Sequence, residues 1–268
     1  MTTATAQQRF RTEYGAQRAA EGRALNLTSL LQLPYLAVGP VAAQWAVRAR
    51  TFDALVTRIV APQARALGRP LRIADLGAGN GWLSWRMALA GHHAVAVDVR
   101  DDHVDGLGAA ASYLEGGGVW FDRIVGSFEA VPMVSERFDL VIFNAALHYA
   151  LDLAATMREA RRLTHVGGRV AILDSPWYND AADGEAMVRE KHRDATGRFG
   201  DRADVLMSLP FIEFLTAARL RLASAPLGIA WTRHRVRYPL RYELRPLVAK
   251  VRGRRTPSRF DLWEGVVA

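Results

Sequence analysis

The chain has 268 residues, half of them hydrophobic and 23% charged, a composition typical of one large globular domain or one domain with an elaboration. It contains no cysteine, which excludes disulfides, zinc ribbons, iron–sulfur clusters and any mechanism with a cysteine nucleophile. The formal net charge is +8, and residues 233–259 (the basic segment) hold nine Arg, one Lys and a single acid. With 33 arginines against two lysines, the bias also fits a GC-rich coding sequence, so the charge is not evidence for nucleic-acid binding.

The N-terminal part predicts neither a leader nor a membrane span. Residues 1–15 are polar and lack the apolar run of a signal peptide. Residues 24–47 carry no charge, but polar side chains and Pro34, Gly39 and Pro40 interrupt them, whereas a spanning helix needs about 20 predominantly apolar residues. We therefore expect a cytoplasmic protein without a transmembrane segment.

Apolar runs and helical spacing alternate along the middle of the chain. A helix is expected over residues 41–66, followed by five strands with helices or loops between them, which indicates a parallel sheet with crossovers. The strands are expected at 71–75, 93–97, 120–125, 138–143 and 169–173, with helices at 82–90, 102–115 and near 153–164. The rest predicts helices over 181–218, in two pieces around 197–200, and an antiparallel edge pair of strands at 220–223 and 262–267.

The glycine-rich turn after the first predicted strand is the sharpest signal. Gly77, Gly79 and Gly81 follow the strand, and a predicted helix opens at Trp82. Glycine lets the backbone turn tightly and lie against a ligand, and the start of a helix offers free N–H groups. Trp82 stands where the dinucleotide fingerprint needs a small residue. We expect Asp75 to put a carboxylate at the ligand, which favours a sulfonium or ammonium group over a pyrophosphate.

Asp98 ends the second predicted strand, 21 residues after Gly77. Doubly wound folds place an acid there to accept hydrogen bonds from ribose hydroxyls. The alternative is a turn aspartate that caps the next helix, and the glycine loop ahead of Asp98 favours the ribose role.

These residues together resemble the class I S-adenosylmethionine (SAM)-dependent methyltransferases. Three more segments match that family in order, so that the resemblance covers residues 71–174. Residues 126–132 resemble the loop that holds the adenine, 138–144 resemble the fourth strand with Asn144 at its ligand-facing end, and 163–169 resemble the turn into strand five. The branch that resembles this chain most contains quinone-biosynthesis and natural-product methyltransferases.

The resemblance implies a Rossmann-like α/β fold with a seven-stranded, mostly parallel sheet, helices on both faces and an N-terminal helical cap. It implies a helical cap or lid at 1–66, a SAM-binding core at 67–176, and a helical lid insertion plus the last two strands at 177–268. The implied cofactor is SAM and the product S-adenosylhomocysteine (SAH). The implied cofactor-binding residues are Asp75, Gly77, Gly79, Gly81, Asp98, Ser127, Phe128 and Asn144.

The adenine loop departs from the family pattern at one position. This branch usually has an acid where Ser127 stands. A hydroxyl accepts a hydrogen bond from the adenine amino group less strongly than a carboxylate does. Phe128 can still cover the ring, and an ordinary turn serine is an equally good interpretation of Ser127.

Three residues near the ligand-binding edge are candidates for catalysis. Methyl transfer from a sulfonium is an in-line displacement, so the protein mainly aligns the reactants, and a base is needed only where the acceptor must lose a proton. His148 could be that base or could pack beside the cofactor. Asp174 could face the substrate or cap the turn before Pro176, and Tyr149 is better explained as a pocket wall.

Several chemistries are excluded or disfavoured. Cytosine C5 methylation and radical SAM chemistry need cysteines. The Asn-Pro-Pro-aromatic motif of adenine amino methylation is absent, because Ala145 follows Asn144. No histidines and acids share metal-ligand spacing, so we expect no metal.

The expected acceptor is a small, apolar or aromatic molecule. Residues 24–50 and 176–218 are expected to cover one face of the sheet, to form a lid that encloses this molecule, or to do both. The basic segment has three interpretations: a solvated surface insertion, a surface that meets anionic lipid, and an RNA-binding face with Tyr238 and Tyr242 stacking on bases. The alternative functions are an RNA methyltransferase, a non-catalytic SAM-binding scaffold and, more distantly, a nicotinamide dehydrogenase. Nucleic acid is the disfavoured partner, and the oligomeric state stays open.

Overall fold

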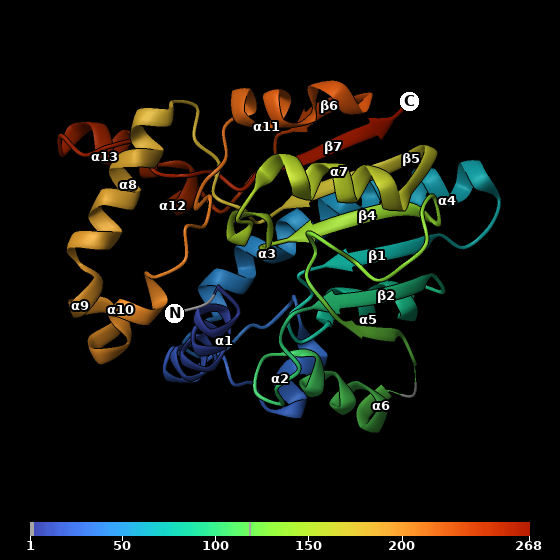
Figure 1. Ribbon diagram of the computed structural model, residues 1–268, viewed down its shortest axis with the longest axis horizontal. Coiled ribbons are helices and arrows are strands. Elements are labelled where there is room, and N and C mark those ends of the chain that lie inside the picture. The colour runs from blue at the N-terminus through green and yellow to red at the C-terminus, as the bar shows by residue number, and fades with distance from the viewer. Residues whose placement is uncertain (1–2, 118) are drawn as a thin grey trace.

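The computed structural model describes residues 3–117 and 119–268 and is built around a seven-stranded sheet (Figure 1). The sheet order is β3-β2-β1-β4-β5-β7-β6; β1 to β5 run parallel, and β7 lies antiparallel between β5 and β6. The strands are β1 (Arg72–Leu76), β2 (His93–Asp98), β3 (Asp122–Val125), β4 (Phe138–Asn144), β5 (Thr164–Leu173), β6 (Ile229–His234) and β7 (Leu262–Val267). The predicted fold class is confirmed.

Helices cover both faces of this sheet. They are α1 (Thr3–Ala20), α2 (Leu27–Gln32), α3 (Ala42–Leu55), α4 (Ala61–Leu67), α5 (Trp82–Leu89), α6 (Ala111–Gly117), α7 (Leu153–Leu163), α8 (Ala181–Arg193), α9 (Ala195–Phe199), α10 (Ala203–Leu206), α11 (Ala217–Ser224), α12 (Leu240–Glu243) and α13 (Arg245–Val251). Among the described residues, none of the helices has the length and apolar character of a membrane span.

The core divides into two layers because successive strand residues point to opposite faces. Ile73 and Ile142 pack on one side with aromatic residues of α3 and α5, whereas Ala74 and Phe143 pack on the other with α7 and α11. Every residue of β4 is buried, as expected for a central parallel strand covered on both faces.

The helix expected over 41–66 is present as α3, a π-helical turn at Val56–Val60, and α4. Pro62 follows that turn and lacks the N–H that a regular helix would donate to the carbonyl of Arg58. The helix ends at Gly68, which adopts a left-handed conformation.

The strand predicted at 220–223 is wrong, because these residues belong to α11. Alternating Arg and Leu from Arg219 to Leu222 imitates a strand, but the Thr216 side chain accepts a hydrogen bond from the N–H of Arg219 and starts a helix. The edge strand next to β7 is β6, six residues further on.

Two predicted helices also differ from the structure. Over 102–115, helical turns begin only at Leu107, because Asp102 accepts the N–H groups of Val104 and Asp105 and holds a turn instead. Over 181–218, α8 to α10 end at Leu206, and the chain then continues without regular structure to a bridge between Trp177 and Leu215, before α11 begins at Ala217.

The carboxyl ends of the parallel strands face a second group of elements. In Figure 1 the arrows of β1, β2 and β4 point towards the side of α1, with α8, α9 and α10 beyond it at the left end of the molecule. The site lies between these elements and the sheet.

Candidate active site

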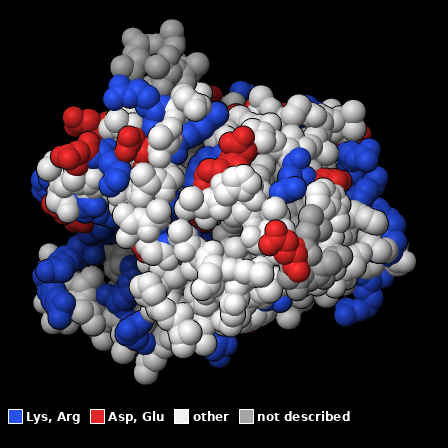
Figure 2. Space-filling view, turned by 90° about the horizontal axis from the view of Figure 1, so that it is seen from below, with Lys and Arg blue, Asp and Glu red and all other residues white. Residues whose placement is uncertain are grey.

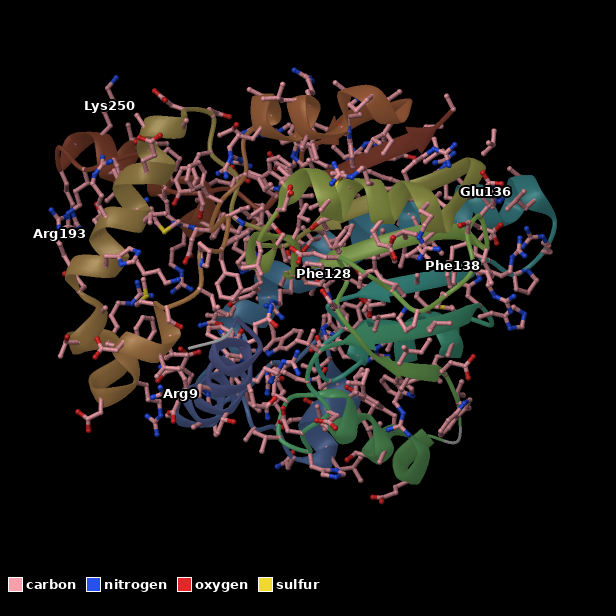
Figure 3. The ribbon with its side chains drawn as sticks, in the orientation of Figure 1. Arg9, Phe128, Glu136, Phe138, Arg193 and Lys250 are labelled. Carbon is pink, nitrogen blue, oxygen red and sulfur yellow. The ribbon has the colours of Figure 1, made fainter. Side chains whose placement is uncertain are left out.

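A cavity of about 600 Å³ lies at the carboxyl ends of β1, β2, β4 and β5. Figure 3 places Phe128 at this edge and Phe138 at the opposite end of β4. The predicted site residues that line the cavity are Gly77, Gly79, Asp98, Ser127, Phe128, Asn144, His148, Tyr149 and Asp174. Parallel sheets bring the ends of strands distant in sequence to one edge, which explains why the structure gathers these residues.

The glycine loop adopts the shape that its composition predicts. Gly77, Gly79 and Gly81 all have positive φ, at 76°, 56° and 76°. A Cβ on Gly77 would lie 2.4 Å from the Cβ of Ala146, and one on Gly81 would lie 2.9 Å from the ring of Phe121. Gly77 therefore opens the cavity floor, whereas Gly81, which does not line the cavity, serves the packing behind the loop.

Asp98 is tied to the same loop. Its Oδ2 accepts the N–H of Gly79 at 2.8 Å, and its Oδ1 accepts the N–H of Arg100 at 2.9 Å. Each carboxylate oxygen keeps a further lone pair that can accept a bond from a ligand hydroxyl. Asp98 thus fits both interpretations, the turn residue and the ribose acceptor.

Asp75 lies beneath the loop and not in the cavity lining. Its side chain has no exposed surface; Oδ2 accepts a hydrogen bond from Ser84 Oγ at 3.0 Å, and Oδ1 has no partner among the described residues. Burial raises the pKa of Asp75 to about 7, against the opposing effect of the Ser84 bond. A carboxylate facing the ligand at this position is therefore not what the geometry supports.

The raised pKa of Asp75 predicts a pH-dependent stability. The folded state holds this proton more tightly than the unfolded chain, so stability falls as the pH rises from about 4 through about 7, by on the order of 4 kcal/mol for a shift this large. Asp75→Asn keeps a partner for Ser84 and removes the charge. Urea unfolding should show the variant gaining on the wild type between pH 5 and pH 8; a difference that stays constant with pH would contradict this.

Asn144, Ser127 and Phe128 all line the cavity. The Oδ1 of Asn144 is buried without a partner among the described residues, so it is left for a ligand donor. Ser127 Oγ accepts the N–H of Glu129 at 3.1 Å and shapes the loop. The ring of Phe128 lies about 3.5 Å from the position of a Cβ on Gly77, where it can cover a planar group. Together with Gly77, these residues fit an adenosyl cofactor.

The side chain of His148 contacts Tyr149 and Ser175. Its ring lies 4.2 Å from the ring of Tyr149, and its Nδ1 lies 3.5 Å from Ser175 Oγ. Burial, and then the charge of Lys191, lowers the pKa of His148 to about 3. A group this weakly basic is neutral across the physiological range, so it is a poor match for a general base.

Asp174, in contrast to His148, has a pKa that is shifted towards the neutral range. Its Oδ1 accepts a hydrogen bond from Thr51 Oγ1 at 2.6 Å, and its buried Oδ2 has no partner among the described residues. Burial raises the pKa of Asp174 to about 6, although nearby Arg48 opposes that rise. A carboxyl group with a near-neutral pKa and one free oxygen can accept a proton at neutral pH.

Backbone strain marks the same edge of the sheet. Ala145 follows β4 and Asp174 follows β5, and both have φ of 54°, a left-handed conformation that side chains disfavour by about 1–2 kcal/mol. Both residues line the cavity. Strained residues cluster at sites where the surrounding structure holds a functional geometry.

Helix α1 supplies a wall that the sequence reasoning missed. Phe10 and Tyr14 come from one face of α1, and their rings contact those of Tyr149 and Phe211. The centroids of contacting rings lie 5.0–5.6 Å apart. The hydroxyls of Tyr14 and Tyr149 lie 3.0 Å apart. The sequence signal for this wall is the i, i+4 spacing of Phe10 and Tyr14, which puts both rings on one face of a helix.

Arginines also enter the cavity. Arg18 pairs with Asp105 at 2.5 Å, whereas Arg48 lies over the ring of Trp45 at 4.8 Å and forms no ion pair within the described residues. Of the acids and histidines in the described ranges, no three gather where they could hold a metal ion.

The strand order, the antiparallel β7 and the glycine loop after β1 define the class I methyltransferase fold. Residues 74–172 match the family described as "Methyltransferase domain". This part of the chain is therefore a SAM-dependent class I methyltransferase domain. The family resemblance found in the sequence is confirmed.

Curated relatives match over part of their length. The chain is 34% identical over 106 residues to a malonyl-[acyl-carrier protein] O-methyltransferase of Erwinia pyrifoliae, covering 38% of this chain and 37% of that protein. It is 31% identical over 112 residues to a ubiquinone biosynthesis O-methyltransferase of Azorhizobium caulinodans, covering 41% of this chain and 43% of that protein.

Solved structures share the fold over a longer range. The magnesium protoporphyrin IX methyltransferase of Synechocystis PCC 6803, solved with bound SAH, aligns with a TM-score of 0.54 at 16% identity, covering 90% of this chain and 94% of that one. At this identity the likeness concerns the fold alone.

Proposed function

We propose that the protein transfers a methyl group from SAM to a hydroxyl oxygen of a small aromatic molecule. The observation that carries this proposal is one cavity that is lined by the glycine loop and Asp98, by Asp174 and by an aromatic wall. Both curated relatives named above are O-methyltransferases, which supports oxygen as the acceptor atom.

SAM supplies a methyl group on a positively charged sulfur that leaves as a neutral thioether. The residues proposed to hold it are Gly77, Asp98, Phe128 and Asn144. Asp98 would accept bonds from the ribose hydroxyls, and Asn144 Oδ1 would accept a bond from a donor of the cofactor.

Asp174 is proposed as the general base. A phenolic hydroxyl that attacks the methyl carbon must lose its proton, and the free Oδ2 of Asp174 is a buried acceptor with a near-neutral pKa. Thr51 holds the other oxygen and so orients the carboxyl group. Tyr149 belongs to the wall, because its hydroxyl is engaged with Tyr14 and burial raises its pKa well above the usual range.

The aromatic wall is proposed to bind the acceptor ring. Phe10, Tyr14, Tyr149 and Phe211 present edges and faces on which an aromatic molecule can pack. Closure by α1 would exclude water from the reacting groups. The cytoplasmic location expected from the sequence stays a prediction.

The test is methyl transfer from labelled SAM to a panel of phenols, aromatic acids and aromatic amines. We expect phenols to be labelled, and Asp174→Asn to abolish most of that labelling. SAH binding without transfer to any panel member would favour a non-catalytic binding protein, and labelling of amines alone would contradict the proposed acceptor.

A further inference from the structure

The segment formed by α12 and α13 exposes a row of apolar side chains (the apolar stripe). Leu240, Leu244, Leu247, Val248 and Val251 are 73%, 43%, 59%, 45% and 80% exposed. Their spacing of i, i+4, i+7, i+8 and i+11 places them along one helical face. Burying such a face is what stabilises most surface helices, so a stripe that faces solvent indicates a missing contact.

Unpaired positive charges flank this stripe. Five exposed side chains of the basic segment form no ion pair or side-chain hydrogen bond with any residue in 3–117 or 119–268: Arg237, Arg241, Lys250, Arg252 and Arg254. The nearby acid Glu243 is already engaged by Arg259 and Arg235. Figure 3 shows Lys250 projecting at the upper left end of the molecule. Lys and Arg side chains also gather at the lower left of the face that Figure 2 shows from below.

The opposite face of the segment is anchored to the protein. The ring of Tyr242 lies 4.8 Å from that of Tyr238 and 6.2 Å from that of Phe260. Tyr238 donates a hydrogen bond from its hydroxyl to the carbonyl of Phe260 at 2.6 Å. Phe260 also lines the cavity, so the contact between Tyr242 and Phe260 connects the segment to the candidate active site.

We propose that α12 and α13 dock on a membrane surface that contains anionic lipids. The arginines and Lys250 would meet lipid phosphates, and the apolar stripe would enter the boundary between headgroups and acyl chains. A helical segment with an apolar face, basic flanks and no unpaired acid is complementary to a surface that is negative outside and apolar inside. An acidic protein partner would satisfy the charges but would not require five separate apolar side chains to project outward.

Docking in this way would bring the cavity close to the bilayer. An acceptor dissolved in the membrane could then reach the site past Phe260 without crossing water. This consequence depends on the proposed acceptor being apolar, but the docking itself does not.

Vesicle sedimentation tests the docking, with phosphatidylcholine alone or mixed with phosphatidylglycerol. We expect binding to the mixed vesicles only, and its loss at salt on the order of 1 M, where screening extends to about 3 Å. Leu247→Glu combined with Val251→Glu should weaken binding about tenfold or more. Leu222→Glu on α11, where Leu222 is 80% exposed, is the matched control and should bind as the wild type does.

A second variant tests the charges alone. Arg241→Gln, Arg252→Gln and Arg254→Gln together should weaken binding about a hundredfold, since each basic residue near an anionic surface contributes roughly fivefold. Removing three exposed charges from Arg58, Arg65 and Arg158 should change little. Equal binding by stripe and control variants, or no binding to anionic vesicles, would overturn the proposal. So would a stripe variant that dissociates an oligomer in light scattering, because the stripe would then be a contact between copies of the chain.

Discussion

Asp174→Asn should lower the methyl-transfer rate about 10²–10⁴-fold, the usual worth of a general base, while SAH affinity stays unchanged. Asn keeps the size of the side chain and an oxygen for the bond from Thr51, so the fold has no reason to change. What is lost is the free carboxylate oxygen that would take the acceptor proton. A rate within a few-fold of the wild type would leave Asp174 as a cap of the turn after β5.

The pH dependence separates Asp174 from His148. A base works in its deprotonated form, so the wild-type rate should rise with pH through about 6, the pKa to which burial raises Asp174, and then level off. His148→Gln should keep this profile, because His148, with a pKa lowered to about 3, does not titrate there. A profile that disappears in His148→Gln and persists in Asp174→Asn would exchange the two roles.

Asp98→Ala should weaken the binding of SAH at least about tenfold. Each hydrogen bond from a ribose hydroxyl to a carboxylate contributes about 1.5–3 kcal/mol. The variant also leaves the N–H of Gly79 without its partner, so the loop should lose some order as well. Titration calorimetry measures the affinity, and urea unfolding measures the accompanying loss of stability.

The matched control is Asp101→Ala, which removes the same charge from the same loop. Asp101 is exposed and does not line the cavity, so its variant should bind SAH normally. If Asp98→Ala also bound SAH normally, the function of Asp98 would be limited to its bonds with the N–H groups of Gly79 and Arg100, and the ribose role would be wrong.

The sheet could be predicted because its strands are nearly uniform apolar runs. β1, β2, β4 and β5 are buried on both faces, and such runs bounded by glycine or aspartate have few alternative structures. The wrong strand at α11 was predicted from such a local pattern, the alternation of Arg and Leu. The helix cap by Thr216 and the burial of Leu220 decide the structure instead.

The cavity was predictable only where the site follows strand ends. Side chains two residues apart in a strand point to the same face, so Asp75 lies with Ile73 on the face covered by α5. The glycine motif alone does not reveal this orientation. Phe10 and Tyr14 reach the cavity because α1 folds back over the sheet edge, and Arg48 because α3 passes beside Asp174. No local pattern encodes these tertiary contacts.

Calorimetric titration of the protein with SAH, and with NAD for comparison, tests whether the cavity binds the methyl donor and its product. We predict one SAH site per chain, a weaker site in Asp98→Ala, and no binding of NAD, since the loop and the family match indicate an adenosyl-sulfur ligand. The same protein should melt at a higher temperature with SAH, because a ligand at about a hundred times its Kd adds about 2.7 kcal/mol of stability. Absence of heat and of any melting shift with SAH or SAM on the order of 1 mM, or tighter binding of NAD, would contradict the account.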